Sequence, residues 1–123
     1  MTPLKPKKIL IIEDNSDILL SIKTFLELEG YRTQIAENGF NAMEMLSANE
    51  MPDLILLDMK MPKMNGWQFA IEFLNKHNHN SPIVVMTAAA DAEQRAKDIC
   101  AIGWIGKPFE LKDLLAIIKK FER

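Results

Sequence analysis

The chain has 123 residues, 48% of them hydrophobic and 26% charged, a composition typical of one globular domain that buries about two thirds of the surface exposed by its unfolded form. Its net charge is -2 and its lysines and arginines are scattered, so direct binding to nucleic acid is not expected. The longest apolar stretches are far shorter than the roughly 20 residues that cross a membrane, and the first residues lack the apolar core of a signal peptide. We therefore expect a cytoplasmic protein without a second domain.

Strand patterns recur along the chain after a short arm. Residues 1–7 are punctuated by prolines and are expected to be flexible, which leaves residues 8–123 as the domain. Four short apolar runs predict parallel strands that are buried on both faces: residues 9–12, 54–57, 83–86 and 104–106. Around residues 31–35 apolar and polar side chains alternate, which predicts a half-solvated strand at an edge of the sheet.

Helical spacing of apolar residues predicts one helix after each strand, at residues 16–29, 39–48, 66–76, 91–101 and 111–121. Gly30 is expected to stop the first helix. The fourth helix has few apolar residues and should bury little, with Cys100 as a packed thiol on its apolar face. The fifth has a longer apolar face and should pack firmly. Five strand–helix units with right-handed crossovers predict an α/β sandwich, in which helices cover both faces of a parallel sheet.

Polar residues follow the four buried runs. These are Glu13 and Asp14 after the first, Asp58 after the second, Thr87 after the third and Lys107 after the fourth. Ligands of parallel sheets bind at the carboxyl ends of the strands, so the five side chains are expected to share one crevice. Three carboxylates crowded together repel one another unless a cation lies among them. Hard oxygen ligands of this kind favour Mg²⁺ or Mn²⁺ over zinc.

Each of these residues also has an ordinary explanation when it is taken singly. Asp14, Asn15 or Ser16 could cap the first helix, which alone would be the favoured interpretation. A threonine at a strand end usually bonds to backbone, and a lone lysine usually lies in solvent. The joint arrangement is more specific, because Lys107 can neutralise a carboxylate or a phosphoryl oxygen while Thr87 donates to another oxygen.

These motifs resemble the receiver domains of two-component response regulators. The matching pieces are the acidic pair at residues 13–14, DMKMPKMNG at residues 58–66, IVVMTA at residues 83–88 and the triplet Lys-Pro-Phe at residues 107–109. The resemblance covers residues 8–121. It implies a flavodoxin-like, doubly wound (βα)5 fold with a five-stranded parallel sheet in the order 2-1-3-4-5.

The resemblance also implies roles for the site residues. Asp58 would be the phosphoacceptor. Asp14, Asp58 and the backbone carbonyl of Lys60 would bind Mg²⁺ or Mn²⁺, and Glu13 would hold a metal-bound water. The peptide bond before Pro108 would be cis and would present the preceding lysine to the site.

Other positions are expected to control switching and lifetime. Thr87 and Trp104 would form a conformational switch, with Trp104 where relatives usually have Tyr or Phe, and Cys100 stands where many have Gly. Lys60 and Ala89, two places after the phosphoacceptor and the threonine, would tune dephosphorylation. Ala89 cannot orient an attacking water and Lys60 adds bulk and attraction, so we expect a long-lived phosphoaspartate.

The expected function is therefore signalling by phosphorylation. The chain would take a phosphoryl group from a phosphohistidine on a histidine kinase or a histidine phosphotransfer domain, and would assist its own phosphorylation and dephosphorylation without being an enzyme in the usual sense. A downstream protein effector would read a change in the face formed by the fourth helix, fifth strand and fifth helix.

Two other functions stay open. One is an aspartate-nucleophile phosphohydrolase, which is disfavoured because no segment could form a cap over a substrate and Lys60 stands where a second acid is needed. The other is a receiver-like interaction module that is never phosphorylated.

Overall fold

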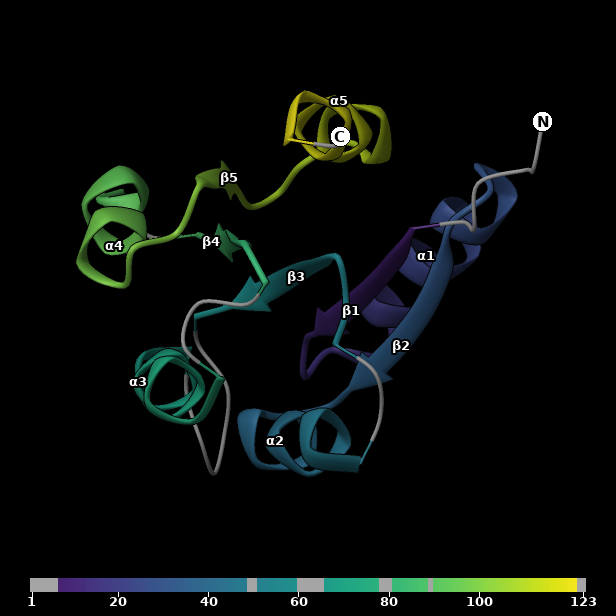
Figure 1. The fold of residues 1–123 in the computed structure, drawn as a ribbon. Coiled ribbons are helices and arrows are strands. Elements are labelled where there is room, and N and C mark those ends of the chain that lie inside the picture. Colours follow the sequence, from purple (N-terminus) through teal and green to yellow (C-terminus); the bar gives the residue numbers. More distant parts are fainter. Residues whose placement is uncertain (1–6, 49–50, 60–65, 78–80, 89, 122–123) are drawn as a thin grey trace, which may run out of the picture.

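Five parallel strands form one sheet in the order β2-β1-β3-β4-β5 (Figure 1). The computed structural model describes residues 7–48, 51–59, 66–77, 81–88 and 90–121. The strands are β1 (Lys8–Ile12), β2 (Arg32–Ala36), β3 (Leu54–Asp58), β4 (Ile83–Thr87) and β5 (Gly103–Gly106). The predicted fold class and strand order are confirmed.

Helices cover both faces of this sheet: α1 (Ser16–Leu28), α2 (Gly39–Ala48), α3 (Gly66–His77), α4 (Ala92–Asp98) and α5 (Leu111–Phe121). The bounds of α2 and α5 are those predicted, and α1 and α3 differ from the prediction by one residue at the carboxyl end. No helix in the described ranges combines the length and the apolar character that a bilayer span needs.

The core has two halves, one on each side of the sheet. Buried residues of α1 and α5 pack against one set of strand side chains, and those of α2 and α3, with Ala96 and Ile99, pack against the other set. Side chains alternate along a strand, so β1 directs Ile9 and Ile11 toward α1 and α5 and directs its other buried residues to the opposite side. Burial on both faces explains why β1, β3 and β4 are continuous apolar runs.

The two edge strands are partly exposed. Four of the five residues of β2 are partly buried, as the alternating pattern predicted. In β5, Ile105 is buried with the α5 side of the core, but Trp104 is 42% exposed. The prediction that residues 104–106 are buried on both faces was therefore wrong. As the outermost strand, β5 turns Trp104 away from α5, toward the face that the short helix α4 leaves partly uncovered.

Helices α1 and α4 end in the same way, although only one of them ends at a glycine. After α1, Gly30 has a φ of 96°, and the N–H of Tyr31 donates to the Leu26 carbonyl over 3.0 Å. After α4, Cys100 has a φ of 59°, and the N–H of Ala101 donates to the Ala96 carbonyl over 2.8 Å. Both are Schellman endings with a left-handed residue just beyond the helix.

Two predictions about the fourth helix were wrong for this reason. The helix ends at Asp98 instead of continuing to residue 101, and Cys100 is exposed instead of packed. Apolar spacing continued through Ile99 and Cys100, but the chain leaves the helix there because the left-handed turn satisfies the last carbonyls of α4.

We predict that Cys100→Gly raises the free energy of unfolding by about 0.5–1 kcal/mol, because glycine adopts the left-handed conformation without the clash of a Cβ atom. Urea denaturation measures this change. Cys100→Ala is the matched control, since it removes the thiol but keeps the Cβ atom, and should leave stability nearly unchanged. Equal stabilisation by both variants would show that the gain does not come from the left-handed backbone at residue 100.

Candidate functional site

Three carboxylates meet at the carboxyl edge of the sheet. Glu13 follows β1 and is fully buried, Asp58 is the last residue of β3 and is 4% exposed, and Asp14 is exposed. The parallel register places Ile12 beside Leu57, which brings the two strand ends together. One oxygen from each carboxylate lies within 4.8 Å of the others.

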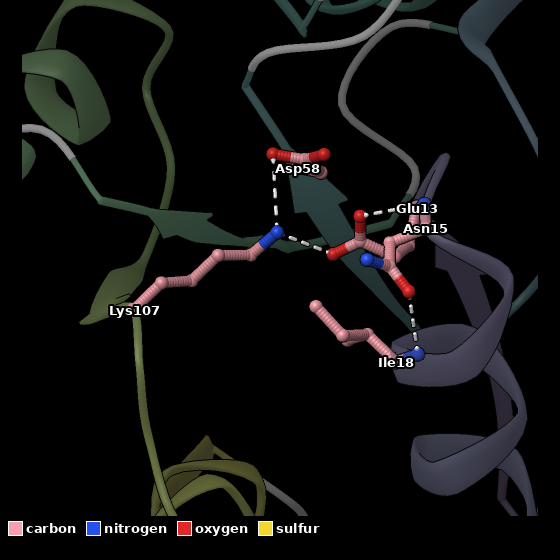
Figure 2. A network of polar contacts seen from close by, with 5 residues as sticks. All are labelled: Glu13, Asn15, Ile18, Asp58 and Lys107. Atoms are coloured by element: carbon pink, nitrogen blue, oxygen red, sulfur yellow. Dashed lines mark hydrogen bonds and ion pairs between the residues drawn. The ribbon is translucent and has the colours of Figure 1, made fainter.

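Both carboxylate oxygens of Glu13 accept hydrogen bonds from protein groups (Figure 2). Oε1 accepts from the ammonium of Lys107 over 2.5 Å, and Oε2 accepts from the backbone N–H of Asn15 over 3.1 Å. The backbone N–H of Glu13 donates to the Ala36 carbonyl at the end of β2, over 3.1 Å. The buried carboxylate is thus held in one orientation.

Lys107 reaches this cluster from the end of β5, the outermost strand beside β4. Its backbone N–H donates to the Thr87 carbonyl over 2.8 Å, and the Lys107–Pro108 peptide bond is cis. Its ammonium lies 3.6 Å from Asp58 Oδ1 in addition to its bond with Glu13, and Figure 2 shows the side chain extended toward both carboxylates. One ammonium therefore contacts two acidic residues.

Thr87 completes the edge between the acidic cluster and the lysine. It is the last residue of β4, it is 6% exposed, and it lies beside Gly106 of β5 in the register. The neighbouring residue Met86 accepts a hydrogen bond from the N–H of Met59 over 3.3 Å, which ties the chain after Asp58 to β4.

The sequence left three residues as possible caps of the first helix, and the structure identifies Asn15. Its side chain Oδ1 accepts from the N–H of Ile18 over 3.1 Å. Asp14 belongs instead to the carboxylate cluster. The sequence could not distinguish the three candidate caps, because they are adjacent and chemically similar. It also gave no sign of the bond from the Asn15 N–H to Glu13.

Gly66 ends the motif at residues 58–66, but the sequence did not show why a glycine is needed there. It begins α3, and its N–H donates to the Met59 carbonyl over 3.2 Å. A Cβ atom at this position would lie 2.7 Å from the Met59 Cα and 3.1 Å from the carbonyl oxygen of Asp58. Only glycine fits without displacing the backbone that follows Asp58.

Some expected site residues are not brought into the cluster or are not described. Trp104 pairs with Val85 in the register, two residues before Thr87 at the end of β4, and its side chain is partly exposed. Lys60 and Ala89 lie outside the described residues, so their roles as a metal ligand and in dephosphorylation stay predictions.

The donor set fits a hard divalent cation. Carboxylate oxygens are the ligands that Mg²⁺ and Mn²⁺ prefer, and the Lys107 ammonium can offset only part of the charge of three carboxylates. A group ending in several anionic oxygens could also be held here, because a cation and an ammonium would both face it.

Comparison with known sequences identifies the family. The sequence model of the response regulator receiver domain matches residues 9–119. Sporulation initiation phosphotransferase F of Bacillus subtilis is 34% identical over 120 residues, which cover 94% of this chain and 93% of that protein. The regulatory protein AtoC of Escherichia coli is 33% identical over 115 residues, which cover 92% of this chain but 24% of AtoC. The chain thus spans about a quarter of the length of AtoC.

Solved structures agree with this assignment. Response regulator TrrA of Thermotoga maritima, in complex with Mg²⁺-BeF, has a TM-score of 0.81 and 30% identity, covering 93% of this chain and 97% of TrrA. The chemotaxis protein CheY4 of Vibrio cholerae has a TM-score of 0.85 and 26% identity, covering 96% of this chain and all of the other. From residue 9 to residue 119 the sequence carries the family pattern on the family fold, and the chain belongs to the response regulator receiver domains.

Proposed function

We propose that Asp58 accepts a phosphoryl group from a phosphohistidine of a partner histidine kinase or histidine phosphotransfer domain. The observation that carries this proposal is the position of Asp58, a nearly buried carboxylate at a strand end, 3.6 Å from an ammonium and within an acidic cluster. Membership of the receiver family, whose domains are phosphoacceptors of two-component systems, supports the same role.

In the transfer step, a carboxylate oxygen of Asp58 forms a bond to phosphorus. The bond from phosphorus to the imidazole nitrogen of the donor breaks, and the electron pair stays on that nitrogen. Lys107 lies close enough to Asp58 to donate a hydrogen bond to an oxygen of the transferred group. Thr87, at the neighbouring strand end, would donate its hydroxyl to another oxygen.

Asp14 and Asp58, together with the backbone carbonyl of Lys60, would bind Mg²⁺ or Mn²⁺, and Glu13 would hold a metal-bound water. The ion would supply positive charge that offsets the repulsion between the carboxylates and the incoming phosphoryl oxygens. Asn15 and Lys107 fix the Glu13 carboxylate in one orientation, so the group that would hold this water is positioned in advance.

The signal would leave through α4, β5 and α5 toward a downstream protein. Helix α4 has seven residues, of which only Ala92 and Ala96 are buried, so little packing has to be broken for it to move. Occupation of Thr87 and Lys107 by the phosphoryl group would favour one arrangement of this face over another.

Incubation with a small acyl phosphate and Mg²⁺ should add one phosphoryl group to the protein, measured by intact mass. Asp58→Asn should abolish the gain without unfolding the domain, because the amide is a poor nucleophile and the change relieves carboxylate repulsion. Asp53→Asn is a matched control: Asp53 directly precedes β3, at the other end of that strand from Asp58, and its carboxylate accepts from the backbone N–H of Lys8 over 2.8 Å. This control should be phosphorylated like the parent.

The same experiment separates the alternative functions. A labile adduct supports the receiver role, rapid release of phosphate over many turnovers supports a phosphohydrolase, and an unchanged mass supports a passive module. Phosphorylation of Asp58→Asn at the parent's rate would contradict the assignment of the phosphoacceptor.

Asp14→Asn should weaken Mg²⁺ binding by about 10-fold or more, because it removes one charged oxygen from the cluster. Calorimetric titration measures the affinity. Asp17→Asn is the control. Asp17 lies in the first turn of α1, outside the cluster, so this substitution removes the same charge without removing an oxygen from the cluster. Equal losses in the two variants would show that overall charge, rather than a ligand at residue 14, determines binding.

Trp104 fluorescence should shift to shorter wavelength on phosphorylation, because the indole is 42% exposed here and is predicted to become more buried as Thr87 engages the phosphoryl group. The measurement uses Trp67→Phe as background, so that Trp104 is the only indole. An unchanged spectrum in protein that mass analysis shows to be fully phosphorylated would rule out a switch role for Trp104.

A further inference from the structure

Asn15 contacts three parts of the chain at the junction between β1 and α1. Its backbone N–H donates to Glu13 Oε2 over 3.1 Å. Its side chain accepts from the N–H of Ile18 over 3.1 Å, and its backbone carbonyl accepts from the N–H of Leu19 over 2.9 Å. Figure 2 shows Asn15 between the carboxylate of Glu13 and the first turn of the helix.

These contacts connect the start of α1 with the charged groups of the site. Glu13 is fully buried, so its carboxylate is oriented by protein donors rather than by bulk water. One of its oxygens is held by the amide of Asn15 and the other by Lys107. Lys107 in turn lies 3.6 Å from Asp58. A shift of the Asn15 amide would therefore move the Glu13 carboxylate, and with it the Lys107 ammonium.

We infer that Asn15 is a positioning residue for phosphoryl transfer to Asp58, an inference that rests on the proposed function. It does not touch the reacting atoms. Its side chain caps α1, and the cap keeps the backbone of residue 15 extended, with φ -80° and ψ 112°. In this conformation its N–H points at Glu13, and Glu13 holds Lys107 beside Asp58.

The side chain matters even though every residue except proline has a backbone N–H. Alanine has no acceptor for the N–H of Ile18, so the first turn of α1 loses the bond that fixes residue 15. Serine keeps an acceptor of suitable reach and adds no charge beside the carboxylates. Aspartate would also cap the helix, but its charge would confound any measurement at this site.

The experiment compares the parent with Asn15→Ala, Asn15→Ser and Asn38→Ala. Asn38 is the matched control because its side chain accepts from the N–H of Asn41 over 2.8 Å at the start of α2, and its carbonyl accepts from Ala42 over 3.1 Å. Asn38→Ala therefore removes the same kind of cap from α2. Among the described contacts, Asn38 makes no bond to Glu13.

The first readout is independent of activity. The amide proton of residue 15 donates to a carboxylate, so its chemical shift, taken relative to the random-coil value of each residue type, should lie downfield in the parent and in Asn15→Ser. It should move upfield in Asn15→Ala and stay in place in Asn38→Ala.

The second readout is the rate of phosphorylation by a small acyl phosphate with Mg²⁺, at a temperature where all four proteins are folded. Asn15→Ala should be slower by about 10-fold, as is typical when a group that orients a reacting or ligating residue is lost. Asn15→Ser and Asn38→Ala should stay close to the parent.

The outcomes separate this inference from the proposed function. A parent that gains no phosphoryl group overturns both. A phosphorylated parent together with an unchanged rate or amide shift in Asn15→Ala, an equal loss in Asn38→Ala, or no recovery in Asn15→Ser overturns the positioning role alone.

Discussion

Charge balance among Glu13, Asp14, Asp58 and Lys107 is the constraint on which the site depends. Two of the carboxylates are almost completely buried, and burial of a charge is costly unless an opposite charge or strong donors compensate it. Lys107, 94 residues after Glu13 in the sequence, supplies that compensation through its bond to Glu13 and its attraction to Asp58 over 3.6 Å. The sheet order makes this possible, because β1, β3, β4 and β5 are neighbours and all end at the same edge.

Register is as important as strand order. In the observed pairing, Ile12 lies beside Leu57 and Thr87 beside Gly106, so the polar residues that end or follow β1, β3, β4 and β5 come to the same edge of the sheet. A slip of one residue would turn buried side chains to the opposite face. The apolar runs that build the core and the polar groups that build the site are thus fixed by the same pairing.

The sequence predicted the parts that follow from pattern. Continuous apolar runs identified the buried strands, and polar residues at their ends identified the cluster, because parallel strands bring their carboxyl ends together. The apolar run at residues 104–106 did not reveal the exposure of Trp104, because that exposure depends on how little of this face of β5 the short helix α4 covers. The sequence did not reveal that α4 ends at Asp98, because the left-handed residue beyond the helix is Cys100 and not a glycine. The contacts of Asn15 and Gly66 depend on distances that no spacing rule contains.

The central claim, that Asp58 is the residue that carries the phosphoryl group, is tested most directly by locating the modification. After incubation of the parent with an acyl phosphate and Mg²⁺, borohydride reduction converts a phosphoaspartate into homoserine, and peptide mass mapping finds the converted residue. We expect conversion at residue 58 alone. Conversion at Asp14 or another carboxylate, or a stable phosphoryl group on a hydroxyl side chain, would contradict the assignment.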